Sequence, residues 1–241
     1  DRSPSRGLGD VYKRQCTSSL SQRTLMQEVK QQWNHSMEKI KYILMGAGGH
    51  ARVVASAIEA MNQEVICVFD PNTSITDLDG IQNKGDYSPT EFPTAKLILT
   101  IGDNVTRKRL ATTVQHEIGT VQHPAAIVDR LVSVGLGSQI LHGAIINRGS
   151  SVGNHCIVNT KASIDHDCTI GDFVHIAPGA TLCGNVTVGE GTLIGAGATL
   201  IPNITIGKNV TVGAATVVTT SLPDNVTCVG IPGKIIKQYE G

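Results

Sequence analysis

The feature that most constrains the fold is a six-residue period in the second half of the chain. Every sixth residue is aliphatic, and the residue four positions further on is small or β-branched. An α-helix would repeat its apolar residues about every 3.6 positions and an extended strand about every 2, so this period predicts short strands joined by tight turns and wound into a coil. The aliphatic positions are Val128, Val134, Ile140, Ile146, Val152, Val158, Ile164, Ile170, Ile176, Leu182, Val188, Ile194, Leu200, Ile206, Val212 and Val218.

The repeat predicts a place for each kind of side chain. We expect the aliphatic residues to point into the coil and stack on one another, and the small residues to turn inward near the corners. Each buried aliphatic side chain contributes about 1.5–3 kcal/mol, so a column of them can form a core although only 3% of the residues are aromatic. A glycine often follows the aliphatic residue, and we expect it to supply the positive φ that a tight turn requires. These glycines are Gly135, Gly153, Gly171, Gly189, Gly195, Gly207 and Gly213.

The segment before the repeat has a different pattern. Apolar runs at 41–45, 65–69 and 96–101 predict three strands, and residues 51–61 and 105–115 have the period of helices. A strand, a helix and a second strand in this order indicate a parallel α/β sheet, of which this segment is long enough for about half of a Rossmann fold.

The chain therefore divides into four parts. Residues 1–36 are predicted to be a non-native or disordered leader, since the first fifteen resemble a translated sequencing adapter and the rest are polar without a pattern. Residues 37–122 form the predicted βαβ domain, residues 123–220 the coil, and residues 221–241 a C-terminal tail.

A glycine-rich turn follows the first predicted strand. Residues 46–51 read GAGGHA and fit the pattern G-x-G-x-x-A, with Asp70 about 20 residues further on. Glycines let backbone N–H groups and a helix N-terminus approach a phosphate. Because half of a doubly wound fold suits one nucleotide, we expect a nucleotide-sugar diphosphate rather than NAD. A tight turn without a ligand is the alternative.

Charge and composition exclude several partners. Lys plus Arg equals Asp plus Glu at 20 each, so bulk charge gives no reason for a nucleic-acid or membrane partner. No apolar stretch approaches the roughly 18 residues of a membrane span, and no signal peptide is visible. The six cysteines contain no CxxC pair, which predicts reduced thiols in a cytoplasmic protein.

Several short motifs together resemble one family. The chain contains GAGGHARVV, a GDN after the third strand, His123-Pro124, IDHDC, FVH and VGIP, all around or within the repeat. Over residues 40–237 it is similar to the bacterial hexapeptide-repeat sugar acyltransferases, which include sialic acid O-acetyltransferases and N-acetyltransferases of UDP-4-amino-dideoxy sugars. The resemblance implies a left-handed parallel β-helix of about five triangular turns, a homotrimer, and acetyl-CoA as co-substrate without a metal.

The resemblance also implies a mechanism and its residues. A sugar amine attacks the acetyl-CoA thioester directly, and a histidine takes up the proton that the amine loses. His166 matches the family's base and Asp167 matches the neighbouring acid, where many relatives carry Glu.

Further site residues follow from the same match. His175 is expected near the thioester, where an N–H would stabilise the oxyanion. Asn159 is expected on the substrate side, and Ala196 and Ala214 along the CoA arm. On the sugar side the matching residues are Gly48, Gly49, His50, Asp70 and Gly102, with His50 close to the diphosphate. Ala215 stands where relatives have Gly, and would cost about 1 kcal/mol if its φ is positive.

Three alternative functions remain open at this stage. The acceptor is a hydroxyl in the first, as in sialic acid O-acetylation. The second is a γ-carbonic-anhydrase-like metal enzyme, although no two of His142, His155, His166 and His175 lie the 18 residues apart that stacked ligands would need. The third is a non-catalytic binding protein. Cys168 lies at an inward small-residue position, so we expect a buried thiol rather than a nucleophile.

Overall fold

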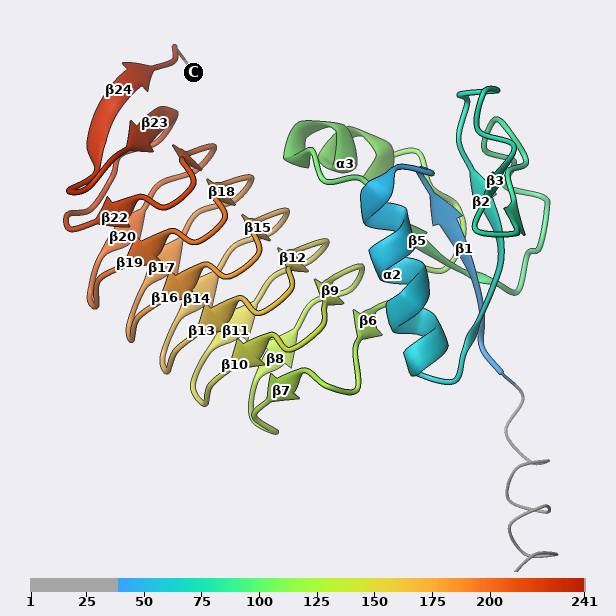
Figure 1. Ribbon diagram of the computed structural model, residues 1–241, viewed down its shortest axis with the longest axis horizontal. Helices are drawn as coiled ribbons and strands as arrows, with labels where there is room; N and C mark the ends of the chain where they lie inside the picture. The colour runs from blue at the N-terminus through green and yellow to red at the C-terminus, as the bar shows by residue number, and fades with distance from the viewer. Residues whose placement is uncertain (1–38, 241) are drawn as a thin grey trace, which may run out of the picture. The chain divides into compact units, whose positions relative to one another are not determined.

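The computed structural model describes residues 39–240, and residues 40–241 form one compact unit (Figure 1). The predicted leader, residues 1–36, lies outside the described residues. No helix within residues 39–240 is long and apolar enough to cross a membrane.

The N-terminal region is a small α/β layer. Its elements are β1 (Lys41–Met45), α2 (Gly49–Ala60), β2 (Glu64–Phe69), β3 (Asp77–Leu78), β4 (Ile81–Gln82), β5 (Lys96–Leu99) and α3 (Asn104–Ala111). The parallel sheet has the order β2-β1-β5, which confirms the predicted βαβ unit. The antiparallel pair β3–β4 was not predicted, and α3 ends four residues before the predicted boundary at residue 115.

The second half is a parallel β-helix of two-residue strands, followed at its C-terminal end by two longer strands that pair antiparallel, and its hexapeptide repeats fit the left-handed form (Figure 1). Its strands are β6 (Val121–Gln122), β7 (Ile127–Val128), β8 (Ser133–Val134), β9 (Gln139–Ile140), β10 (Ile145–Ile146), β11 (Ser151–Val152), β12 (Ile157–Val158), β13 (Ser163–Ile164), β14 (Thr169–Ile170), β15 (His175–Ile176), β16 (Thr181–Leu182), β17 (Thr187–Val188), β18 (Leu193–Ile194), β19 (Thr199–Leu200), β20 (Thr205–Ile206), β21 (Thr211–Val212), β22 (Val217–Val218), β23 (Val226–Val229) and β24 (Lys234–Gln238).

These strands form three sheets, which are the sides of a prism. The first side contains β7, β10, β13, β16, β19 and β22, the second contains β8, β11, β14, β17 and β20, and the third contains β6, β9, β12, β15, β18, β21, β23 and β24. The first side has six strands, so the prism makes about six turns rather than five. Strands β6 and β23, which were expected in the flanking parts, pair with the third side and extend it.

The predicted aliphatic column is confirmed. From Ile140 to Val218 every member of the column is buried, and so are the small residues at the corners, including Cys168. Val128 and Val134 are only half-buried, because they lie in the first turn, where the column ends.

The predicted role of the glycines was wrong. Positive φ occurs three residues after the aliphatic position, at Gly137 and Gly143 but also at non-glycine residues such as Asp167 and Ala215. The glycines directly after the aliphatic position are needed because the coils stack closely. A Cβ on Gly135 would lie 2.5 Å from the carbonyl carbon of Gly153, which is the equivalent residue of the next turn. The same holds further along this column and on the third side: a Cβ on Gly189 would lie 2.6 Å from the carbonyl carbon of Gly207, and a Cβ on Gly195 would lie 2.6 Å from that of Gly213.

The N-terminal region packs on the third side of the prism. Leu141 and Ile157 share one apolar core with residues of α2 such as Val54 and Ile58. Asn104, at the start of α3, donates through Nδ2 to the carbonyl oxygens of Gly191 and Thr192, at 2.9 and 3.1 Å. This packing places the glycine-rich turn next to the outer face of the third side.

Candidate active site

The turn between β13 and β14 carries the predicted catalytic pair. Asp165 Oδ1 accepts the backbone N–H of His166 at 2.8 Å and also accepts from Asn147 Nδ2, in the previous turn of the prism, at 2.9 Å. Asp167 has the positive φ of its repeat position, 59°. With this backbone its Oδ2 lies 2.8 Å from His166 Nδ1. The local conformation of the turn thus holds the carboxylate against the imidazole.

The hydrogen bond to Asp167 determines what the His166 ring can do. Nδ1 carries the hydrogen that Asp167 accepts, so in the neutral ring Nε2 has a free lone pair. The pKa of His166 is raised, first by the hydrogen bond to Asp167 and then by the negative charge of Asp165. The His166 side chain is 61% exposed and its ring lies over Gly184, where a Cβ would be 2.5 Å from Nε2. This arrangement suits a general base that meets its partner at the surface of the prism.

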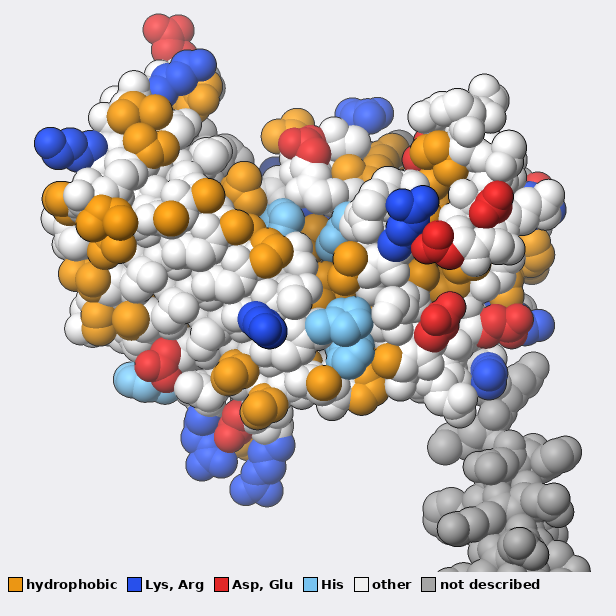
Figure 2. All heavy atoms as spheres, in the orientation of Figure 1, with side chains coloured by type: hydrophobic (Ala, Val, Ile, Leu, Met, Phe, Trp, Pro, Cys, Tyr) orange, Lys and Arg blue, Asp and Glu red, His pale blue; other side chains and the backbone are white. Residues whose placement is uncertain are grey.

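A second group of polar side chains lies on the outer face of the third side. His50, from the start of α2, and His175, from β15, have ring centroids 6.3 Å apart. His50 Nε2 lies 2.8 Å from Oε1 of Gln139, a buried residue of β9. Figure 2 shows histidine side chains gathered between the prism and the N-terminal region. The fold thus brings together the predicted substrate residue His50 and the predicted cofactor residue His175.

His175 has both ring nitrogens in hydrogen bonds. Asn159 Oδ1 accepts the backbone N–H of Thr160 at 2.8 Å, so its NH₂ group faces His175 and donates to Nε2 at 3.1 Å. The hydrogen therefore lies on Nδ1, which donates to the Gly102 carbonyl at 3.3 Å. Because the one N–H of the ring is used by the Gly102 carbonyl, the oxyanion role expected for His175 requires the Nδ1 bond to open.

Arg107 of α3 is a buried charged residue beside the two histidines that the sequence analysis did not single out. It is fully buried, and donates through Nε to the His155 carbonyl at 2.8 Å and through Nη2 to the Phe173 carbonyl at 2.9 Å. Its Nη1 donates to the Ile101 and Gly102 carbonyls, and no carboxylate among residues 39–240 pairs with it.

The charge of Arg107 acts on both histidines of the cluster. Burial, followed by the nearby positive charge of Arg107, lowers the pKa of His175 to about 4. The pKa of His50 is lowered as well, mainly by burial. Both imidazoles are therefore neutral near pH 7.

The glycine-rich turn is held open at the start of α2. Asp70 Oδ2 accepts the backbone N–H of Ala47 at 2.8 Å, and its Oδ1 accepts that of Asn72 at 2.9 Å. A Cβ on Gly48 or Gly49 would meet no atom within 4 Å, so the space in front of the turn is free. The N-terminus of α2 has no side-chain cap, which leaves backbone N–H groups for an anion.

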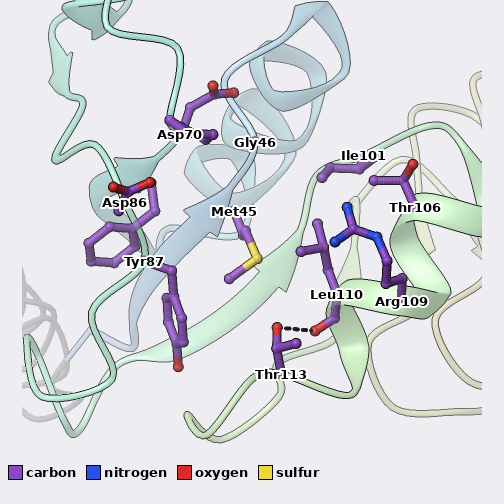
Figure 3. Close-up of a pocket in the computed structure, with 12 residues that line it drawn as sticks. Met45, Gly46, Asp70, Asp86, Tyr87, Ile101, Thr106, Arg109, Leu110 and Thr113 are labelled. Atoms are coloured by element: carbon purple, nitrogen blue, oxygen red, sulfur yellow. Dashed lines mark hydrogen bonds between the residues drawn. The ribbon is translucent and has the colours of Figure 1, made fainter.

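A pocket of about 420 Å³ adjoins this turn at the carboxyl ends of the strands (Figure 3). Asp86 and Tyr87 lie on one side of it, and Arg109 and Leu110 of α3 on the other. Tyr87 is fixed by a 2.7 Å hydrogen bond between its hydroxyl and His116 Nδ1. In the sheet order β2-β1-β5 the chain changes direction at β1, and ligands of such sheets bind at this position. Sequence reasoning missed Asp86 and Tyr87, because they lie in a segment without a regular pattern, and it missed Arg109, because a helical period does not show which side chains face a pocket.

Comparisons with known proteins agree with this architecture. Family models of the PglD N-terminal domain and of the bacterial transferase hexapeptide match residues 41–114 and 185–220. Perosamine N-acetyltransferase from Caulobacter crescentus, solved as a variant with CoA and GDP-perosamine, is 34% identical with a TM-score of 0.79, over 84% of this chain and 100% of that one. The acetyltransferase domain of PglB from Neisseria gonorrhoeae, solved with acetyl coenzyme A, is 32% identical with a TM-score of 0.77, over 83% and 100%. The comparison with curated proteins finds no match.

The chain belongs to the hexapeptide-repeat sugar N-acetyltransferases. In this acetyltransferase His166 and His175 lie on different parts of the prism. His166 occupies the corner between the first and second sides, whereas His175 lies on the third side. A single chain therefore does not bring the predicted catalytic pair to the predicted sugar-side residues.

The remaining predicted positions lie at the corner between the third and first sides. Ala196 and Ala214 are exposed there in successive turns, and Ala215 N–H donates to the Ala196 carbonyl at 2.8 Å. Ala215 has a φ of 55°, so the condition for its predicted strain is met.

Within residues 39–240 of the acetyltransferase no three His, Cys, Asp or Glu side chains are grouped so as to hold a metal ion.

Proposed function

We propose that the protein transfers the acetyl group of acetyl-CoA to the amino group of a nucleotide-linked 4-amino sugar. The observation that carries the proposal is the 2.8 Å contact between His166 Nδ1 and Asp167 Oδ2, which leaves Nε2 free as a base. Relatives whose solved structures hold CoA and GDP-perosamine support the choice of substrates. They are N-acetyltransferases, which favours the amine over the sugar hydroxyl of the alternative reading.

The proposed reaction is a direct transfer. The sugar nitrogen attacks the thioester carbonyl, a C–N bond forms and the C–S bond breaks. His166 Nε2 takes the proton that the nitrogen loses, and Asp167 stabilises the resulting imidazolium. The proton then passes to the CoA thiolate. A base placed in this way accelerates the reaction by about 10²–10⁴-fold.

The proposed sugar nucleotide binds at the glycine-rich turn. Backbone N–H groups at Gly48 and Gly49 are suited to the diphosphate, since they begin α2 and have free space in front of them. The neighbouring pocket, with Asp70 at its edge, has room for a nucleoside. The exposed corner at Ala196 and Ala214 is where we place the CoA arm.

We also propose a homotrimer as the active form. The separation of His166 from the third side within one chain supports this, since a neighbouring prism can bring its own His166 to the sugar-side residues. Five free cysteines among the described residues, four of them buried, suit a reducing compartment such as the cytoplasm.

The test is a screen of acetyl-CoA with three acceptors, namely GDP-perosamine, a UDP-4-amino-dideoxy sugar and sialic acid, and with buffer alone as the control. Release of the CoA thiol and the mass of the product report the reaction, and sedimentation velocity reports the oligomer. Acetylation of an amino sugar nucleotide supports the proposal. Acetylation of sialic acid alone would move the assignment to the hydroxyl, and no acceptor-dependent thiol release would refute acetyl transfer.

A further inference from the structure

Gln139 makes a defined contact with each end of its side-chain amide. It is fully buried in β9, and its Nε2 donates to the Leu99 carbonyl at 2.9 Å, at the end of β5. Its Oε1 lies 2.8 Å from His50 Nε2. A backbone carbonyl can only accept, so the NH₂ group must face Leu99 and the oxygen must face His50. His50 Nε2 must then carry the hydrogen.

This contact determines the chemistry of the other nitrogen of His50. Buried beside the cation Arg107 and the neutral ring of His175, the His50 imidazole is neutral, and its pKa is lowered mainly by burial. In a neutral ring only one nitrogen carries hydrogen, so Nδ1 presents a lone pair. No residue within 39–240 pairs with this atom.

The Nδ1 atom of His50 is also accessible. The buried side-chain nitrogen and oxygen atoms without a partner, within the described part of the chain, are Nδ1 of His142 and Nδ1 of His155. His50 Nδ1 also has no partner but is not among these buried atoms. It is therefore in contact with solvent. A ligand at the start of α2 can therefore reach it.

We propose that Gln139 fixes His50 as its Nε2–H tautomer, so that Nδ1 accepts a hydrogen bond from a hydroxyl or amino group of the nucleotide-linked sugar. The proposal rests on the proposed function and deepens it. A phosphate oxygen is itself an acceptor and cannot pair with this lone pair, so the diphosphate is left to the backbone N–H groups of the turn. His50 is thus a residue that selects the sugar, and Gln139 is a positioning residue.

The tautomer is measured first, in the full chain without a ligand. Proton–nitrogen correlation spectra of protein labelled with ¹⁵N-histidine distinguish the two tautomers of each ring. We expect His50 to carry its hydrogen on Nε2, and the Gln139→Met variant to lose this preference. The matched control Gln122→Met changes an exposed glutamine of the neighbouring strand β6 and leaves the His50 signals unchanged. A hydrogen on Nδ1 in the wild type would overturn the proposal, even if Gln139→Met does not fold.

The ligand contact is then measured by calorimetry with GDP-perosamine and with GDP. We expect His50→Leu to weaken GDP-perosamine binding by about tenfold, the loss of one hydrogen bond to a buried group, and GDP binding by less than about twofold. His50→Asn, which keeps an acceptor near the position of Nδ1, should restore part of the difference. An equal loss of affinity for both ligands would place His50 on the nucleotide and refute the sugar contact. A wild-type protein that binds neither ligand would also refute the sugar contact. Failure of the proposed function can be distinguished from failure of this proposal. In the first case no acetyl transfer is detected, although the His50 tautomer is the one expected here.

Discussion

Asp167 Oδ2 and His166 Nδ1 lie 2.8 Å apart although the two residues are neighbours in sequence. Adjacent side chains on an extended strand point to opposite faces, so this contact depends on the turn. The positive φ of Asp167 directs its carboxylate back to the imidazole. The contact between the two side chains therefore results from the turn conformation that the repeat imposes at the third position after each aliphatic residue.

Replacing His166 by Asn should lower kcat by about 10²–10⁴-fold, because the variant lacks a base for the attacking amine. The ring is exposed, so the unfolding midpoint should stay within the error of the wild type. Steady-state kinetics with the amino sugar nucleotide and thermal unfolding measure the two effects. A variant with full turnover would contradict the catalytic role.

Replacing Asp167 by Asn should move the pH profile. The carboxylate is the main cause of the raised pKa of His166, so its removal lowers that pKa. Activity requires the neutral ring, and kcat/KM therefore rises with pH through the pKa of His166. We expect this rising limb to lie at lower pH in the variant, with a reduced plateau. A limb that stays in place or moves to higher pH would exclude Asp167 as the partner of the base.

Gly184→Ala should disturb the base without unfolding the prism. A Cβ at this position would lie 2.5 Å from His166 Nε2, and Gly184 has no positive φ that a side chain would strain. The imidazole can swing away, so we expect little change in stability and a fall in kcat. Thermal unfolding of the same sample is the control, since a lowered midpoint would instead indicate a damaged coil.

Arg107→Met should strongly destabilise the protein. The change leaves the carbonyls of His155 and Phe173 and the Asn104 side chain without their buried donor, which costs about 3–5 kcal/mol in the free energy of unfolding. Denaturant unfolding measures it. Arg130→Met, a change at an exposed arginine, is the control and should stay within about 0.5 kcal/mol.

Ala215→Gly should stabilise the protein by about 0.5–1 kcal/mol. Ala215 has a φ of 55°, which an L side chain adopts at a cost and glycine does not. The neighbouring change Ala214→Gly lacks this benefit, since Ala214 has no positive φ, and should lose stability through the larger entropy of the unfolded chain. Equal effects of the two changes would show that the strain at Ala215 is negligible.

The sequence by itself determined the features that repeat or lie close along the chain. The period of six predicted the buried column from Ile140 to Val218. The resemblance of the IDHDC motif to the family implied the pairing of His166 with Asp167. The order of apolar runs and helical periods predicted the parallel βαβ unit, with its first helix beginning two residues later than α2 does. These features follow from local periodicity, which the order of residues contains.

Only the tertiary structure decided the contacts whose partners are distant and follow no period. Gln139 and His50 are 89 residues apart, and Arg107 reaches the carbonyl of Phe173 across 66 residues. The glycines were misread for a related reason, because Gly135 is required by the backbone of Gly153 in the next turn and not by its own φ. The physical cause is that packing acts between surfaces brought together by folding, whereas a sequence pattern describes neighbours along one chain.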